Sequence, residues 1–243
     1  MPGPTVTSRV ADVLDVFAGA TGRLTLSELS RRCGLPLTTT HRLATELAAR
    51  RLLERDRDGR YGIGLRLWEI AARAPRTVDL REAALPFLED LYEATHENVQ
   101  IAVLDGAEVV YVERILGRRA VHVVTRPGTR LAAHATGVGL VLLAHASIEQ
   151  VDAVLAGPLC RYTEHTVTDP RRLRRVLADI RRVGYAISDR QIETVSASVA
   201  APVLGPGADV VAALSIVVAA GTRTRALVPA VVAAARGVSR SLA

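Results

Sequence analysis

The sequence predicts an α+β protein, with a small helical unit at the N-terminus and a larger unit built on a mostly antiparallel sheet. Three observations lead to this prediction. Residues Leu26–Ala49 have the pattern of two short helices with a break at residues 34–36. A hairpin signal follows at Asp58-Gly59. From Asn98 onward, the apolar residues change from helical spacing to the alternation typical of strands.

Residues at the ends of the two short helices support the first observation. Thr25 precedes the first helix and Glu28 follows three residues later, which is the pattern of a capping box. Gly34 fits the position just past a helix end, where φ is often positive, and Pro36 suits the first turn of the next helix. Two helices joined by a tight turn containing glycine predict a helix-turn-helix.

The second of these helices has one face that is expected to be buried and one that is expected to be exposed. With about 100° per residue, Thr40, Leu43 and Leu47 share the buried face. The candidates on the opposite face are hydrogen-bonding side chains without a carboxylate, and such groups can bind base edges and phosphates. A solvated face of any small helical domain is the alternative. The candidate DNA contacts on this helix are Thr38, Thr39, His41, Arg42 and Thr45.

The segment after this helix is predicted to be a basic hairpin. Tyr61 and Ile63 are expected to pack inward on its returning strand. A basic hairpin behind a recognition helix is the wing of a winged helix-turn-helix, and it can lie along the phosphate backbone. Asp56 and Asp58 dilute the positive charge, so an ordinary surface hairpin is the alternative. The candidate phosphate contacts are Arg55, Arg57 and Arg60.

Composition bounds the class of protein. The chain has 243 residues, of which 49% are apolar, which is enough for one large or two ordinary domains. Residues 1–75 contain 12 arginines and 8 acidic residues (net +4), and residues 76–243 contain 19 and 17 (net +2), which together give the formal charge of +6. Two cysteines do not form a disulfide framework, and neither a secretory signal nor a membrane-spanning apolar run is present. We therefore expect a soluble cytoplasmic protein that makes no membrane contact.

The domains are expected to comprise residues 1–75 and 76–243, with a linker near residues 73–79. A helix from about Leu80 to Thr95 should kink or break at Pro86. Two strands around Asp105-Gly106 follow. The remaining expected elements are strands at Ala120–Thr125, Ala186–Ser188, Ala197–Val203 and Val210–Val218, and helices at Thr136–Ala146, Ile148–Leu155, 170–183 and 224–242.

Several stretches together resemble the IclR family of bacterial transcriptional regulators. They are LTLSELSRRCGLPLTTTHRL, ERDRDGRYGIG, GTRLAAHATGVG and SVAAPV, in the order that the family has them. The resemblance implies that the larger domain has a GAF-like or profilin-like fold that binds an effector, and that the protein forms homodimers or homotetramers. Two residues depart from the family pattern, since Leu140 stands where a lysine is common and Thr194 near a usual glycine. These departures concern the effector pocket and leave the DNA-binding half unaffected.

The first candidate for a small-molecule site is a helix start at Thr136, Gly137 and Val138. Backbone N–H groups at a helix start can hold an anion. A capped helix that packs tightly has the same sequence pattern, so the residues alone leave both interpretations open. The resemblance implies effector contacts at this position.

Ser198 and Ser215 are the second candidate, because each interrupts an otherwise apolar strand. Such residues are either hydrogen-bonded core groups or ligand contacts. If the two strands fold about the turn at residues 205–209, the hydroxyls lie almost directly opposite each other. The resemblance again favours effector contacts, and Asp189, after the preceding strand, is a weaker candidate.

These features predict a ligand-responsive regulator that binds pseudo-palindromic double-stranded operator DNA and senses a small organic molecule, by family analogy a carboxylate or an aromatic acid. The alternatives are a DNA-tethered enzyme acting on a small organic acid and a DNA-binding protein with an empty sensor domain. His134, Cys160 and His165 are the residues that such an enzyme would use. The sequence contains no nucleophile elbow, Walker loop or paired metal-ligand spacing, so we expect no catalysis, cofactor or metal.

Overall fold

The computed structural model describes residues 5–20, 22–118, 120–123 and 125–243, and for residues 75–77 the backbone alone. The chain divides into two units, Met1–Val78 and Asp79–Ala243. The sequence predicts this division after residue 75. Among the described residues, no helix is both long enough and apolar enough to cross a membrane.

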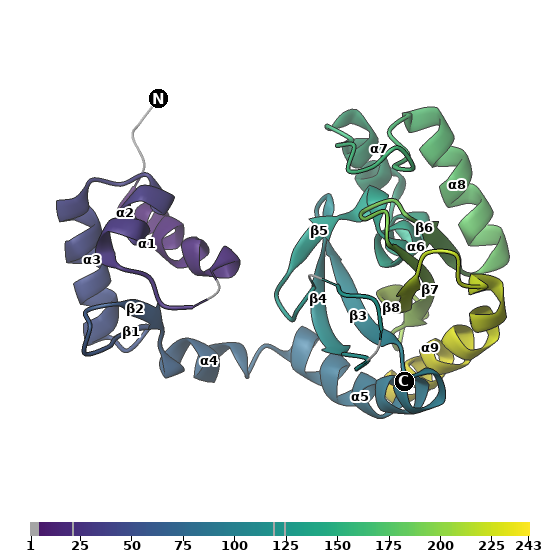
Figure 1. Cartoon of the computed structure of the whole chain (residues 1–243), viewed down its shortest axis with the longest axis horizontal. Coiled ribbons are helices and arrows are strands. Elements are labelled where there is room, and N and C mark those ends of the chain that lie inside the picture. The colour runs from purple at the N-terminus through teal and green to yellow at the C-terminus, as the bar shows by residue number, and fades with distance from the viewer. Residues whose placement is uncertain (1–4, 21, 119, 124) are drawn as a thin grey trace. The chain divides into compact units, whose positions relative to one another are not determined.

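The first unit contains a helix-turn-helix followed by a two-stranded hairpin (Figure 1). Its core is formed by apolar side chains from α1, α2, α3 and the hairpin, among them Val13, Leu29, Leu43, Leu53 and Tyr61. In chain order, its elements are α1 (Val6–Asp15), the 3-10 helix η1 (Val16–Gly19), α2 (Leu26–Cys33), α3 (Leu37–Ala49), β1 (Leu53–Arg55), β2 (Tyr61–Ile63) and α4 (Leu65–Ala71).

The ends of α2 are as the sequence predicts. The Thr25 side chain accepts a hydrogen bond from the Glu28 backbone N–H (3.2 Å), and the Glu28 carboxylate accepts one from the Thr25 N–H (2.8 Å). These two bonds form a capping box. Gly34 ends the helix in the left-handed conformation, at φ 69°. Pro36 stands at the N-cap of α3, one position earlier than expected.

The hairpin turn also forms where the sequence predicts it, but one side chain of the returning strand is more exposed than expected. Tyr61 is buried and exchanges two backbone hydrogen bonds with Leu24 (2.8 and 2.7 Å). Ile63 was expected to pack inward as well, yet 48% of it is exposed. The small core covers Tyr61 and does not extend to the end of the strand.

The second unit is a six-stranded antiparallel sheet with strand order β5-β4-β3-β8-β7-β6. This sheet and the helical first unit confirm the predicted α+β class. The remaining elements are α5 (Pro75–Thr95), β3 (Asn98–Asp105), β4 (Glu108–Ile115), β5 (Arg130–Ala132), η2 (Ala133–Ala135), α6 (Gly137–His145), α7 (Ile148–Ala156), α8 (Pro170–Val183), β6 (Ala186–Asp189), β7 (Ser196–Leu204), β8 (Val210–Ala219), η3 (Thr224–Leu227) and α9 (Val228–Leu242).

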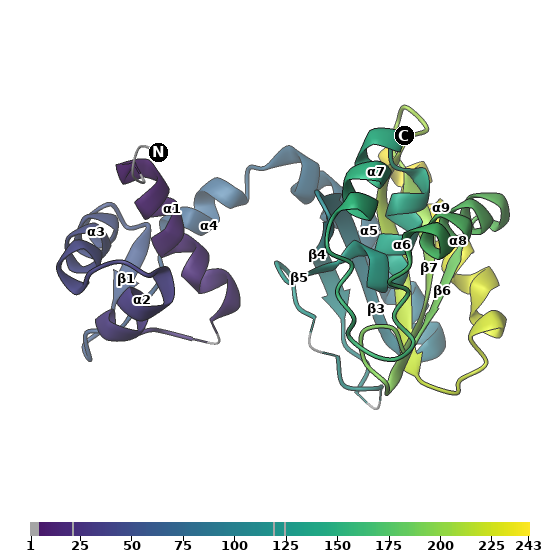
Figure 2. The same cartoon turned by 90° about the horizontal axis from the view of Figure 1, so that it is seen from above.

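Helices cover both faces of this sheet (Figures 1 and 2). One core lies between the sheet and α6, α7 and α8, and the other lies between the sheet and α5 and α9. The strand positions under α6 are small, as at Ala102, Ala200 and Ala213. Alanines at these positions let α6 lie close to the sheet, which places the start of that helix over the central strands.

Two features of this unit differ from expectation. Of the kink or break expected at Pro86, the break does not occur, since α5 runs from Pro75 to Thr95 as one helix. The cost of an internal proline, about 3 kcal/mol, is outweighed by burial of Leu80, Leu88 and Leu91 on the sheet, at about 1.5–3 kcal/mol for each side chain. No strand forms at 120–123 or 125, and residue 124 lies outside the described residues. The edge strand is β5 instead.

Candidate functional site

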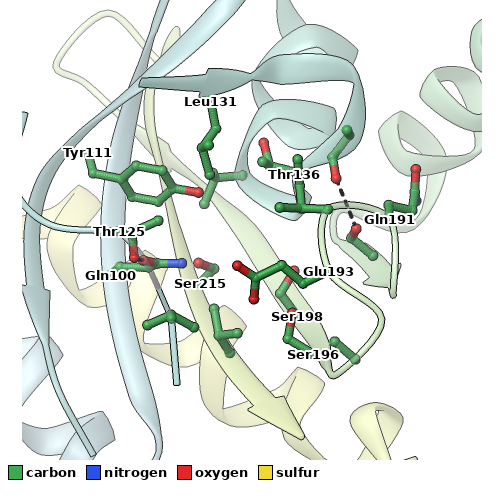
Figure 3. Close-up of a pocket in the computed structure, with 18 residues that line it drawn as sticks. Gln100, Tyr111, Thr125, Leu131, Thr136, Gln191, Glu193, Ser196, Ser198 and Ser215 are labelled. Carbon is green, nitrogen blue, oxygen red and sulfur yellow. Dashed lines mark hydrogen bonds between the residues drawn. The ribbon is translucent and has the colours of Figure 1, made fainter. Parts of the chain in front are cut away.

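A cavity lies between the central strands and the start of α6 (Figure 3). The space between its walls amounts to about 510 Å³, part of which is open to solvent. The walls come from all six strands of the sheet, from the corner between η2 and α6, and from the loops that join β4 to β5 and β6 to β7.

The helix start predicted as an anion site forms one wall. Thr136, Gly137 and Val138 all line the cavity. The Thr136 hydroxyl caps α6 by accepting a hydrogen bond from the Gly139 N–H (3.1 Å). The N–H groups of Gly137 and Val138 find no partner among the described residues. They are therefore available to a ligand.

Both glycines at this helix start are required by close packing. A Cβ on Gly139 would lie 2.2 Å from the Ala133 carbonyl oxygen, and one on Gly137 would lie 2.5 Å from Ser198 Oγ. Real Cβ atoms do not approach other atoms so closely. The strand residue Ser198 is thus held directly against the start of α6.

Ser198 and Ser215 both line the cavity, as predicted, but they do not pair directly. Ser198 is opposite Val217, and Ser215 is opposite Ala200, so the two serines are offset by two residues in the register of β7 and β8. The two serines are diagonal neighbours on one face of the sheet. Ser215 is 1% exposed and its hydroxyl has no hydrogen-bond partner among the described residues.

Asp189 does not line the cavity. Its carboxylate binds the Arg190 guanidinium at 3.2 and 2.9 Å. Successive strand residues point to opposite faces, so Ser188 faces the cavity and Asp189 faces away from it. The sequence predicts that Asp189 contacts the effector, but its side chain lies outside the lining of the cavity.

Seven polar residues of the cavity lining were not predicted from the sequence: Gln100, Tyr111, Thr125, Ser188, Gln191, Glu193 and Ser196. Gln100 on β3 lies opposite Ser215 and accepts a hydrogen bond from the Thr125 hydroxyl (2.7 Å). Burial raises the pKa of the Tyr111 hydroxyl well above its usual range, so this hydroxyl stays protonated. Glu193 extends from the β6–β7 loop into the cavity (Figure 3). Gln100 could have been found from the sequence, because it is a polar residue in the otherwise apolar run of β3. Glu193 stands in no such pattern.

The exposed face of α3 carries the residues predicted to contact DNA. Thr38, His41, Arg42 and Thr45 are exposed, and Thr39 is half-buried. Thr40 is buried, as expected, and donates to the Pro36 carbonyl (3.1 Å). Arg42 makes no ion pair or hydrogen bond with another side chain within the described part of the chain.

The Asp56 side chain forms hydrogen bonds within the hairpin turn. Its carboxylate accepts backbone hydrogen bonds from Asp58 (3.0 Å) and Arg60 (2.8 Å). Arg55 lies over the ring of Tyr61, 5.5 Å from its centroid, while the side chains of Arg57 and Arg60 are exposed and form no ion pair among the described residues. The Asp56 carboxylate keeps its charge, which is partly offset by the Arg23 guanidinium at 3.9 Å.

The residues considered for catalysis have structural roles. His134 is buried, and its Nε2 donates to the Cys160 carbonyl (2.9 Å). His165 lies 3.5 Å from the carboxylate of Glu164, on the surface. In the ranges that the structure describes, no three His, Cys, Asp or Glu side chains are grouped as a metal site.

A winged helix-turn-helix followed by a sheet domain with an internal cavity defines the class of ligand-binding transcriptional regulators. Residues 6–57 match the domain described as "IclR helix-turn-helix domain", and residues 72–242 match "Bacterial transcriptional regulator IclR C-terminal". The chain therefore belongs to the IclR family of bacterial transcriptional regulators.

Individual relatives agree with this assignment. The regulator BhcR of Paracoccus denitrificans is 32% identical over 241 residues, covering 97% of this chain and 86% of that protein. The regulator XynR of Escherichia coli is 31% identical over 210 residues, covering 86% and 83%. A crystal structure of an IclR homologue from Microbacterium hydrocarbonoxydans, complexed with 4-hydroxybenzoate, is 39% identical, covers 98% of this chain and 99% of that chain, and has a TM-score of 0.93. These relatives are regulators, so the chain is a ligand-responsive transcriptional regulator and the hypothesis of a DNA-tethered enzyme is set aside.

Proposed function

We propose that this regulator binds a pseudo-palindromic operator as a homodimer or homotetramer in the cytoplasm, and that a small aromatic acid in the cavity controls its affinity for DNA. The buried hydroxyl of Ser215 carries the effector half of this proposal. A buried hydroxyl without a partner costs about 1–3 kcal/mol. A ligand that hydrogen-bonds to it recovers that cost.

The chemistry of the cavity supports a carboxylate as one group of the ligand. The N–H groups of Gly137 and Val138 lie at the positive end of α6, where anions are stabilised. Ser198, whose hydroxyl lies against Gly137, supplies a neutral hydrogen-bond donor beside them, and Ser215 supplies another from β8. The relative that binds 4-hydroxybenzoate shares the fold over nearly its whole length, which supports an aromatic acid in particular.

For DNA, we propose that Arg42 binds a guanine edge in the major groove, because its guanidinium is exposed and free of ion pairs in the described part of the chain. Thr38, Thr39, His41 and Thr45 bind neighbouring bases or phosphates. The wing contributes phosphate contacts through Arg55, Arg57 and Arg60. Asp56 opposes these contacts less than a free carboxylate would, since it lies 3.9 Å from the Arg23 guanidinium.

Assembly is supported by the surface of α4. Trp68, the single tryptophan of the chain, is 65% exposed, and Leu65 and Ile70 are also exposed. A helix-turn-helix reads only a few base pairs, and dimers of this motif bind two half-sites spaced by whole helical turns. A second copy of the chain that covers α4 would bury these apolar side chains and supply the second half-site contact.

A thermal-shift comparison of small acids tests the effector half. A ligand at 100 times its Kd adds about 2.7 kcal/mol to the stability of the native state. We expect 4-hydroxybenzoate or a related aromatic acid to raise the unfolding temperature, and 4-hydroxybenzyl alcohol, which lacks the carboxylate, to raise it less. Equal shifts for both compounds, or no shift with any aromatic acid, would contradict a carboxylate-binding cavity.

A further inference from the structure

Glu193 brings a carboxylate into the wall of the effector cavity. It belongs to the loop between β6 and β7, and its side chain is half-buried and points into the cavity (Figure 3). Neither an ion pair nor a hydrogen bond to this carboxylate is found within the described ranges. The side chain is therefore available to a ligand.

The loop that carries Glu193 is held in place on the side away from the cavity. The Thr163 hydroxyl donates to the Arg190 carbonyl (2.6 Å), and the Thr166 hydroxyl donates to the Gln191 carbonyl (2.7 Å). The Arg190 N–H also donates to the Ser196 carbonyl (2.9 Å), which closes the loop at its base. These bonds hold the two ends of the loop segment that carries Glu193.

No cation balances this carboxylate among the lining residues that the structure describes, which include no arginine, lysine or histidine. The other polar groups of the wall are neutral: hydroxyls, amides and backbone N–H groups. An unbalanced carboxylate repels an anionic group of a ligand and attracts a hydrogen-bond donor. A hydrogen bond from a hydroxyl to a carboxylate is about twice as strong as one between neutral groups.

The same cavity therefore contains two chemically different regions. The N–H groups at the start of α6 and the Ser198 hydroxyl, which lies against Gly137, favour an anion. Glu193 favours a donor. An aromatic acid with two carboxylates can bind the region at the start of α6 with one of them, but Glu193 repels the other. An aromatic acid that carries a hydroxyl in place of the second carboxylate can bind in both regions.

We infer that Glu193 is a specificity-determining residue, which selects effectors that carry a hydrogen-bond donor, such as a phenolic hydroxyl or an amino group, in addition to the carboxylate. This inference rests on the proposed function, because it takes an aromatic acid as the effector. It adds a recognition element from the β6–β7 loop to those supplied by the helix and the strands.

Calorimetric titration of the full-length protein with three probes tests the inference. The probes are 4-hydroxybenzoate, benzoate and benzene-1,4-dicarboxylate. We expect the wild-type protein to prefer 4-hydroxybenzoate over benzoate by roughly 10- to 100-fold, since loss of a hydrogen bond to a charged group has an effect of this size. Glu193→Gln should reduce that preference at least several-fold and should strengthen binding of the dicarboxylate. Glu164→Gln is the matched control, because the Glu164 side chain is 85% exposed and lies outside the cavity lining.

The outcomes separate the inference from the proposed function. If Glu193→Gln binds all three probes in the wild-type ratio, the selecting role of Glu193 is wrong while the aromatic-acid site stands. If the wild-type protein binds none of the three, the proposed effector class and the inference fall together. Should Glu193→Gln not fold, as judged by circular dichroism, Glu193→Ala gives the same ratios to compare.

Discussion

The hydroxyl of Ser198 occupies the space that a side chain on Gly137 would need. A Cβ on Gly137 would lie 2.5 Å from Ser198 Oγ, but 3.5 Å from the Ala200 Cβ and 3.6 Å from the Ser198 Cβ. The conflict is therefore with one oxygen atom. This contact joins the start of α6 to β7 and defines the corner of the cavity at which we propose that the effector carboxylate binds.

The first prediction follows from that contact. Gly137→Ala should lower the free energy of unfolding by about 1–3 kcal/mol, as overpacking does. Adding Ser198→Ala should recover most of the loss, because it removes the clashing oxygen. Thermal unfolding of both single variants and the double variant measures the coupling. Gly157→Ala, where the nearest atoms are at 3.5 Å, is the control. Additive effects in the double variant would contradict the contact.

The second prediction concerns Ser215, whose hydroxyl should affect the stability of the fold and the affinity for the effector in opposite ways. Ser215→Ala removes a buried hydroxyl that has no described partner, so stability should stay the same or rise by up to about 1 kcal/mol. Effector affinity should fall about tenfold, which is the net value of one hydrogen bond to a charged group. Unfolding and calorimetric titration on the same preparation report both quantities. A variant that loses stability while keeping effector affinity would show that the hydroxyl is structural.

Much of the fold follows from local signals in the sequence. Thr25 with Glu28, Gly34, and the Asp58-Gly59 turn each specify backbone geometry within a few residues, and each is found in the structure. The same holds for Asp169 and Gly184, which begin and end α8. Such caps depend on short-range hydrogen bonds, so the sequence alone predicts them.

The details of the cavity depend on irregularities that the sequence does not signal. Tyr111 and Glu113 are two residues apart on β4, yet they face opposite sides of the sheet, because a bulge interrupts the pairing between them. Tyr111 lines the cavity, whereas Glu113 forms an ion pair with Arg81 of α5. The register of β7 and β8, which shifts between Val203 and Leu204, likewise places Ser198 opposite Val217, two residues from Ser215. Long-range register of this kind is set by packing of the whole sheet.

The third prediction separates base recognition from phosphate contact. Arg42→Ala should cost about 1–3 kcal/mol on the operator and relax the preference at one base pair. Arg60→Ala should weaken all sequences about equally and reduce the slope of log K against log salt by about 1. Mobility-shift titrations on operator and random duplexes distinguish the two effects. Arg182→Ala, an exposed arginine of α8 paired with Asp179, is the control. Unchanged operator affinity in Arg42→Ala would rule out α3 as the recognition helix.

The fourth prediction uses Trp68 as a built-in reporter of assembly. Because it is the single tryptophan and 65% of it is exposed in the chain alone, its emission should be red-shifted in a monomer. If a second copy covers α4, the emission maximum of Trp68 at micromolar protein concentration should be at a shorter wavelength than in the monomer. It should move to longer wavelength on dilution. Light scattering at the same concentrations gives the mass. A monomeric mass at micromolar concentration, with and without DNA, would overturn the proposed homo-oligomer.

Control of DNA binding by the effector cavity is tested most directly by one measurement. An operator selected from a random duplex pool is titrated with the full-length protein, with and without saturating 4-hydroxybenzoate. Coupling between sites of 1–3 kcal/mol predicts a change in operator Kd of about 5- to 150-fold. We expect this change in the wild-type protein, and its loss in the Ser198→Ala/Ser215→Ala double variant, whose affinity for DNA alone stays at the wild-type value. An operator Kd that is the same with and without bound 4-hydroxybenzoate would contradict control by that effector.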